Sequence, residues 1–299
     1  MDTSKLTPYE NKALDEINQW QTAREGVLTK ATRLIGRPVE WLVDRVPARI
    51  KDTINKAIMG FIEMLYDTSK WTYSKDGIKK KAQRLGIDIT DCGELQNYEL
   101  EKLDKIAREH FTSHKIASAL TGAGCGLGGF VLIAVDIPAL FLTSFRAIQL
   151  IGTSYGFDME NPTMLPVIMS VFSAGSAASS AAKAAALADM RVAVIALGKN
   201  WTFKKIAEKT QTGVLVNLLR EQLKSLPKEI TQNVTKRKLA QTIPIAGSAV
   251  GAGFNYWFMS NTTKAAYMIF RYMYLERKYG SASDDNSDGQ PDLSPAPQD

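Results

Sequence analysis

Long stretches without a charged residue are the strongest pattern in this chain. Three of them, Ile116–Val135, Asn161–Ala182 and Leu239–Thr263, are long enough to be candidates for membrane-spanning helices. The first and third contain segments rich in glycine and other small residues, Thr121–Phe130 and Ile243–Phe254. Each glycine costs a helix about 1 kcal/mol relative to alanine, so the composition argues against simple spans.

Small residues four positions apart give these segments a second interpretation. Such spacing lets two helix backbones approach closely, in lipid or in a soluble core. We therefore expect the glycines at this spacing to lie at close helix contacts, and the pattern does not say which solvent surrounds them. They are Gly122, Gly124, Gly126 and Gly128 in the first segment, and Gly247 and Gly251 in the second.

The two Gly-rich segments also begin units that resemble each other. Gly-Phe occurs at Gly129 and Gly253, and Tyr-Gly occurs at Tyr155 and Tyr279, so both dipeptides recur 124 residues apart. Each unit is predicted as a Gly-rich apolar helix, a break, and a second helix that ends in Tyr-Gly, with glycine as the capping residue.

The predicted breaks supply N-cap chemistry for the second helix of each unit, at Asp136-Ile137-Pro138 and at Ser260-Asn261-Thr262. No alternation typical of β-strands competes with this interpretation. The sequence therefore predicts an all-α protein, a helical bundle built around two pseudo-repeated Gly-rich helical hairpins.

A capping box marks the first predicted helix. Thr7 can accept a hydrogen bond from the amide of Glu10, and Pro8 occupies the first helical position, where its missing N–H does no harm. We expect this helix to continue to about Leu34. Further predicted helices are an amphipathic one with its apolar stripe from Ile50 to Leu65, a short basic one at Asp76–Arg84, and a charged one at Glu94–His114.

Charge separates the end of the chain from the rest. Ser281–Asp299 contains five aspartates, no lysine or arginine and no aromatic residue, which predicts a disordered acidic tail at 281–299 after a helical domain at 1–280. Setting aside these five negative charges raises the net charge from +6 to +11. Such a body attracts anionic lipid headgroups, although a solvated basic surface remains an alternative. Nucleic acid is not an expected partner, because the basic residues are scattered and no recognised module is present.

The basic helix is the candidate membrane-contact surface. Aromatic residues precede it, and its cationic side chains could lie at a membrane interface or on a solvated face. They are Lys79, Lys80, Lys81 and Arg84.

Asp136, Arg146 and Arg271 form a candidate anion or ligand site. Asp136 and Arg146 flank an apolar stretch, and a buried charge requires a partner. Asp136 has an alternative role as a helix N-cap. Arg146, if it faces the same pack as Arg271, could bind an anion.

Other candidate chemistry lacks its required context. Gly124–Gly129 matches G-x-G-x-x-G without the preceding strand or the following acidic residue of a dinucleotide site. His110 and His114 could share a helix face, but the H-E-x-x-H order is absent, and Cys125 is interpreted as a small packing residue. We expect no cofactor and no metal, and the sequence identifies no catalytic residue.

Two cysteines, Cys92 and Cys125, do not make a disulfide framework and are typical of a reducing compartment. The first residues lack the basic and apolar regions of a signal peptide, so a cytoplasmic location is expected.

Several of these strings together resemble the EcsC family. The resemblance implies an all-helical fold, and because that family is named for a member encoded beside an ABC transporter, it suggests an accessory role; it carries over no functional residue. The strings are Tyr9-Glu10, Trp20, Thr121–Gly129, Asp136–Leu140, Arg146, Tyr155–Asp158 and Ile243–Asn255.

The leading hypothesis is a non-enzymatic protein at the cytoplasmic face of the membrane, peripheral and accessory to a transporter or another envelope process. An alternative is an enzyme that acts on a phosphorylated or lipid-like substrate between the two hairpins. A third hypothesis makes Ile116–Val135 and Leu239–Thr263 true membrane spans. The sequence predicts no oligomeric state.

Overall fold

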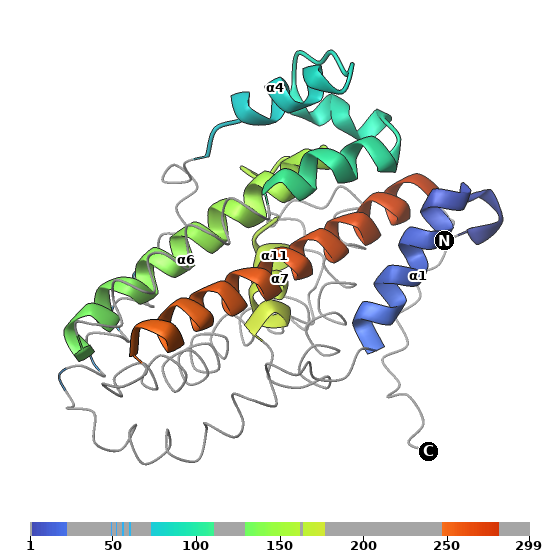
Figure 1. Ribbon diagram of the computed structural model, residues 1–299. Helices are drawn as coiled ribbons and strands as arrows, with labels where there is room; N and C mark the ends of the chain where they lie inside the picture. Colours follow the sequence, from blue (N-terminus) through green and yellow to red (C-terminus); the bar gives the residue numbers. More distant parts are fainter. Residues whose placement is uncertain are drawn as a thin grey trace, which may run out of the picture.

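The computed structural model describes residues 2–22, 49, 52, 56, 60, 73–110, 129–161, 164–176 and 247–280 (Figure 1). Within these ranges the regular structure is helical and no strand occurs, which confirms the all-α prediction. The α-helices are α1 (Pro8–Thr22), α4 (Asp76–Arg84), α6 (Gly129–Ser154), α7 (Leu165–Ser176) and α11 (Gly247–Tyr279), with short 3-10 helices η1 (Thr3–Lys5) and η3 (Cys92–Asn97) and further helical residues at 100–110.

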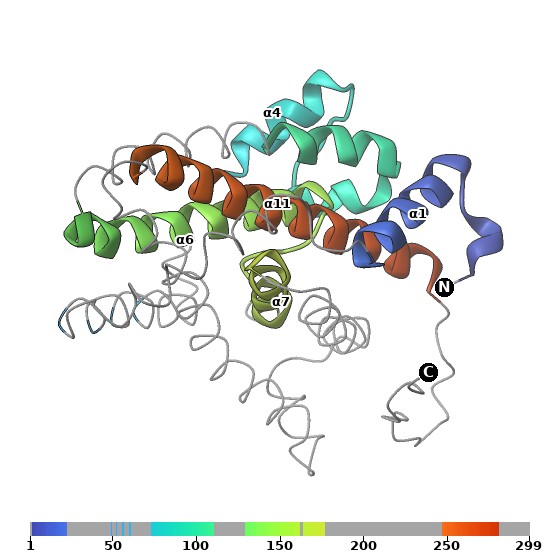
Figure 2. The ribbon, with the colours of Figure 1, turned by 60° about the horizontal axis from the view of Figure 1, so that its bottom comes forward.

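Helices α6 and α11 form the centre of the described structure. They lie side by side and run in the same direction in both ribbon views (Figures 1 and 2). Ring contacts join them. The ring centroids of Phe141 in α6 and Phe258 in α11 are 5.9 Å apart, and those of Phe157, which follows α6, and Phe270 in α11 are 5.6 Å apart. Helix α7 packs on the same core, where Phe172 makes an edge contact with Phe141. Burial of these apolar side chains is the main stabilising contribution here.

The predicted breaks within the two long helices are wrong. Helix α6 continues through Asp136-Ile137-Pro138, and α11 continues through Ser260-Asn261-Thr262. Pro138 lies in the interior of α6, where a proline lacks the N–H that would donate to the preceding turn. In α11, the hydroxyl of Thr263 donates to the Met259 carbonyl at 2.8 Å within the helix. Each predicted hairpin is therefore one continuous helix over the described residues, and the relation between the two units stays a prediction.

Glycine ends α4 and α6 in the manner of a Schellman motif. Gly86, with a φ of 72°, follows α4, and the Ile87 N–H donates to the Ala82 carbonyl. Gly156, with a φ of 76°, follows α6. Its N–H donates to the Thr153 carbonyl, and the Phe157 N–H donates to the Gly152 carbonyl. This confirms the predicted cap at Tyr155-Gly156. Gly280 follows α11 as predicted, but it lies outside the left-handed region, where Gly86 and Gly156 are found among the described glycines.

The capping box at the N-terminus is confirmed. The Glu10 amide donates to the Thr7 hydroxyl at 3.2 Å, and the Glu10 carboxylate accepts from the Thr7 amide at 2.9 Å. Helix α4 is also confirmed at Asp76–Arg84.

The helix predicted at Glu94–His114 begins later in the structure, at residue 100. Asp91 and Glu94 form a capping box for η3, and the chain is extended at Tyr98 before the helical residues 100–110 begin. This capping box satisfies the local amides within a short 3-10 helix, so Glu94 does not start the longer one. The predicted extensions at 23–34 and 111–114, and all but positions 52, 56 and 60 of the helix expected over 50–65, lie outside the described residues.

Several predictions on the Gly-rich segments fall outside what is described. Gly122, Gly124, Gly126 and Gly128 and the acidic tail at 281–299 are not among the described residues, whereas Gly247 and Gly251 lie in the first turns of α11. Within the described ranges, no helix combines the length and the apolar character that crossing a membrane requires.

Candidate functional site

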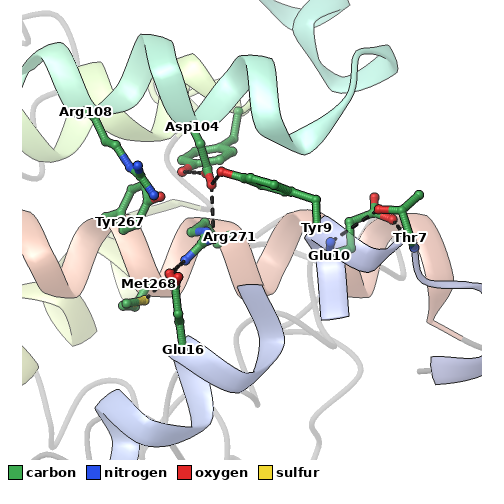
Figure 3. A network of polar contacts seen from close by, with 10 residues as sticks. Thr7, Tyr9, Glu10, Glu16, Asp104, Arg108, Tyr267, Met268 and Arg271 are labelled. Atoms are coloured by element: carbon green, nitrogen blue, oxygen red, sulfur yellow. Dashed lines mark hydrogen bonds and ion pairs between the residues drawn. The ribbon is translucent and has the colours of Figure 1, made fainter. Parts of the chain in front are cut away.

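A buried ion pair joins α11 to the helical segment 100–110. The Nη2 atom of Arg271 lies 3.1 Å from Oδ2 of Asp104, and both side chains are almost completely buried, at 2% and 1% exposure (Figure 3). Arg271 also contacts Glu16 of α1, with 2.8 Å between Nη1 and Oε2. One guanidinium therefore faces two carboxylates from two other segments.

Two tyrosines complete the surroundings of Asp104. The hydroxyl of Tyr9 donates to Oδ2 at 2.7 Å, and the hydroxyl of Tyr155 donates to Oδ1 at 2.6 Å. With Arg271, these bonds give both carboxylate oxygens a donor, as a buried charge requires. The network thus connects α1, segment 100–110, the end of α6 and α11.

Tyr267 extends this network toward the surface. Its ring lies beneath the Arg271 guanidinium, 4.7 Å from the carbon Cζ, and its hydroxyl accepts from Nε of Arg108 at 2.9 Å. Arg108 is exposed, unlike Arg271. We call the seven residues the charged network: Tyr9, Glu16, Asp104, Arg108, Tyr155, Tyr267 and Arg271.

Burial and pairing hold these groups in defined protonation states. Burial raises the pKa of Tyr9, Tyr155 and Tyr267, and the charge of Asp104 raises it further. Burial opposes the charge on Arg271, but Asp104 outweighs it and raises the pKa. At Glu16, burial raises the pKa, yet the hydrogen bond and charge of Arg271 lower it overall. At neutral pH the tyrosines are therefore neutral, whereas Arg271 and Glu16 are charged.

A second buried carboxylate ties the start of the chain to the end of α11. Glu10, 2% exposed, accepts from the Lys278 ammonium at 3.0 Å and from the Tyr279 hydroxyl at 2.9 Å. The Asp2 amide donates to the Tyr279 carbonyl at 2.9 Å. Helix α1 is therefore bound to α11 at two polar points, at Glu10 and at Glu16.

The three residues of the predicted anion site lie in different settings. Arg271 is buried against Asp104 and Glu16, whereas Arg146 is exposed on α6. Asp136 lies in the interior of α6, so its alternative role as the N-cap of a helix is wrong. The structure does not bring Arg146 and Arg271 into one environment.

The basic side chains of α4 mostly have partners close by. Lys81 and Arg84 both face Glu109, at 3.5 Å and 3.2 Å, and Lys79 donates to the Thr90 carbonyl at 2.6 Å. Lys80 is exposed. Helix α4 is thus attached to segment 100–110, although an exposed pair such as Arg84 with Glu109 contributes only about 0–1 kcal/mol.

The histidines and cysteines considered as metal ligands or nucleophiles are described in part. His110 is buried, with the Lys81 ammonium 3.3 Å from both ring nitrogens, and Cys92 is buried, which raises the pKa of its thiol. His114 and Cys125 lie outside the described residues. In the ranges that the structure describes, no group of three or more histidine, cysteine, aspartate or glutamate side chains could hold a metal ion.

Sequence reasoning singled out Arg271 but missed its partners. A usable signal was present at Asp104, which lies four residues after Leu100 and three before Ala107, both buried. A carboxylate within the apolar stripe of a helix indicates a buried charge that needs a cation. No comparable signal marks Tyr9 or Glu16, because the sequence around each is equally typical of a residue on the exposed surface of α1.

Comparison with known proteins adds the relatives of this chain. The model of the EcsC protein family matches residues 11–275. The chain is 24% identical to the uncharacterized protein YdbA of Bacillus subtilis (strain 168) over 265 residues, which cover 87% of this chain and 91% of that protein. It is 20% identical to Protein EcsC of the same organism over 238 residues, 79% of this chain and 84% of that protein. No solved structure matches. Because the family model covers most of its length, this chain belongs to the EcsC protein family.

Proposed function

We propose that this protein is a non-enzymatic helical protein that associates peripherally with the cytoplasmic face of the membrane. The observation that carries the proposal is the charge distribution: five negative charges lie in 281–299, and the rest of the chain has a net charge of +11 against +6 for the whole. A surplus of this size attracts anionic lipid, at about 1 kcal/mol for each Lys or Arg near the surface.

Helix α4 supplies a specific contact for this proposal. Lys80 and Arg84 are exposed, and the apolar side of the helix is buried through Ile78 and Ala82. The helix therefore keeps its shape while its cationic side stays in contact with solvent. An accessory role beside an ABC transporter or another envelope system comes only from the earlier resemblance to the EcsC family.

The protonation states of the charged network favour a structural role for it over a catalytic one. General acid–base catalysis works best with a group that titrates near the operating pH. The pKa values of the three tyrosines in the charged network shift upward from 10, and that of Glu16 shifts downward from 4.5, so each pKa moves farther from neutral pH. The alternative hypothesis of an enzyme is also weakened, because the Arg271 guanidinium that it would use to bind substrate is paired with two carboxylates.

Vesicle flotation tests the proposal with the purified full-length chain. One set of vesicles contains phosphatidylcholine alone, and the other also contains phosphatidylglycerol. We expect flotation only with the anionic vesicles, and a loss of flotation at high salt because salt screens the attraction. Absence of binding to both vesicle types, in a chain that stays dissolved without detergent, contradicts the proposal.

A pair of variants locates the contact on α4. Replacing Lys80 and Arg84 together by glutamine removes about 2 kcal/mol of attraction, so anionic vesicle binding is expected to weaken about thirtyfold. The matched control replaces Lys102 and Lys105 by glutamine, which removes the same charge from a segment outside α4; these lysines pair with Glu99 and Glu101, as Arg84 pairs with Glu109. Equal weakening in both variants contradicts a specific role for α4.

A further inference from the structure

The last turns of α11 contain one cation whose charge is compensated differently from that of its neighbours. Arg271 and Lys278 each form ion pairs with carboxylates of other segments. Within the ranges that the structure describes, Arg277 forms no ion pair with a carboxylate. Its Nη2 atom donates to the Tyr155 carbonyl at 2.8 Å, and its carbon Cζ lies 4.3 Å from the centroid of the Phe157 ring. Arg277 therefore keeps a positive charge that neither contact cancels.

The two contacts order the Arg277 guanidinium and leave most of its donors available. A guanidinium has five N–H donors, and the Tyr155 carbonyl takes one of them. Partial burial lowers the pKa of Arg277; at Arg271 burial acts in the same direction, but Asp104 outweighs it. Arg277 is nevertheless exposed, so a carboxylate can approach it from the solvent. An ordered guanidinium binds two carboxylate oxygens at a lower entropic cost than a mobile one does.

Arg277 lies close to the point where α4 begins. Its ring partner Phe157 follows α6, and Glu160, three residues later, pairs with Lys75 directly before α4, with 3.0 Å between Nζ and Oε2. Lys80 of α4 is exposed and, like Arg277, has no carboxylate partner among the described residues. The start of α4 and the end of α11 thus both adjoin the turn after α6, and each helix has a cation of this kind.

The segment directly after α11 carries the opposite charge. Residues 281–299 contain five aspartates and no lysine or arginine. The first two, Asp284 and Asp285, follow Gly280 by four and five residues of chain, which span at most about 18 Å when extended. Arg277 lies less than one helical turn before Gly280, so both carboxylates are within reach of its guanidinium. Because the segment is tethered, its effective concentration at Arg277 is on the order of mM.

We propose that the acidic segment 281–299 folds back onto Arg277 through Asp284 and Asp285, and that it thereby competes with anionic lipid for the basic side of the protein. The pairing gives Arg277 the carboxylate that its neighbours on α11 already have. It also brings negative charge toward α4, where Lys80 belongs to the proposed membrane contact. The pairing itself needs no membrane, whereas the competition rests on the proposed membrane association.

Proteolysis of the full-length chain tests the pairing. An endoprotease that cleaves before aspartate releases the segment, and mass spectrometry follows the rate of release, with cleavage before the exposed Asp88 as an internal reference. Arg277→Gln removes the cation and is expected to speed release about threefold relative to that reference, the effect of one partly screened ion pair. Lys105→Gln is the matched control, because it removes one positive charge from an exposed side chain of segment 100–110, and it should leave the rate unchanged.

Arg277→Lys separates the charge of this side chain from its packing. The variant keeps the positive charge and loses the planar contact with the Phe157 ring. We expect it to release the segment more slowly than Arg277→Gln does. If both variants speed release equally, the packing of the helix end controls cleavage and the proposed pairing is wrong.

Flotation with vesicles that contain phosphatidylglycerol tests the competition. Replacing the five aspartates of 281–299 by asparagine changes no residue of the described structure. The replacement is expected to strengthen vesicle binding about tenfold in the wild-type chain. A smaller gain is expected in the Arg277→Gln chain, where the segment is no longer held beside α4.

The outcomes distinguish the pairing from the proposed function. Release that Arg277→Gln speeds more than Lys105→Gln does, without vesicle binding by any variant, supports the pairing and contradicts membrane association. Equal release from the wild type, Arg277→Gln and Lys105→Gln overturns the pairing, whatever the vesicles show. An equal gain in vesicle binding in both backgrounds overturns the competition. Slow release that is lost on dilution assigns the contact to a second copy of the chain and contradicts folding back.

Discussion

Replacing Asp104 by asparagine is the most direct test of the charged network. The substitution keeps the size of the side chain and removes its negative charge. Arg271, 2% exposed at the side chain, is then left with Glu16 as its carboxylate partner, 2.8 Å away. The two tyrosine hydroxyls that donate to Asp104 at 2.7 and 2.6 Å also lose a charged acceptor.

The size of the effect follows from these contacts. Removing one partner of a buried ion pair typically costs about 3–5 kcal/mol, because the other charge stays buried. Glu16 still compensates part of the charge on Arg271, which places the expected cost near the lower end, about 3 kcal/mol. The weakened tyrosine bonds act on the same carboxylate, so their cost is not added separately. Such a loss is a large part of the usual stability of about 5–15 kcal/mol.

Urea unfolding followed by circular dichroism measures this free energy. Lys105→Gln is the control, because it breaks an exposed pair with Glu101, where the side chains are 57% and 52% exposed. Such a pair contributes about 0–1 kcal/mol. If Asp104→Asn lowers the free energy of unfolding no more than the control does, Asp104 does not stabilise the fold as the structure indicates.

Three further predictions follow from caps and protonation. Gly156→Ala is expected to lower the free energy of unfolding in urea more than Gly86→Ala does. Both glycines have a left-handed φ, which costs about 1–2 kcal/mol for alanine. A Cβ at Gly156 would also lie 2.5 Å from the Gln96 backbone nitrogen, whereas a Cβ at Gly86 would have nothing within 4 Å. Equal costs contradict this reasoning. Burial raises the pKa of Glu10, but hydrogen bonds from Thr7 and Lys278 outweigh it and lower the pKa below 4.5, so its stabilisation exists above that pH and is lost as pH falls further. Unfolding measured against pH should therefore show the stability difference between wild type and Glu10→Gln shrinking below pH 4.5, and a constant difference argues against it. In ultraviolet titration, the three tyrosines of the charged network should ionise above pH 10, and ionisation at their ordinary pKa would contradict the effect of burial and of Asp104 on them.

Helix caps were predictable because their signals are local. The Thr7–Glu10 capping box and the glycine after α6 depend on residues within one helical turn, and the structure confirms both. Helix continuity was less predictable. Asp136-Ile137-Pro138 and Ser260-Asn261-Thr262 have the chemistry of a helix start, yet each lies inside a helix, in α6 and in α11 respectively. A local capping preference of about 1 kcal/mol does not outweigh the packing of a long apolar helix.

The sequence by itself determined that this chain is helical, and it singled out Arg271 as part of a candidate anion site. Arg271 is the single charge in an apolar run from 265 to 275, and such a charge is stable in a core only when paired. Only the tertiary structure decided that Asp104 and Glu16 supply the pairing, and that Arg146 stays exposed instead. The physical reason is separation along the chain: Glu16 and Arg271 are 255 residues apart, and helix packing rather than any local periodicity brings them together.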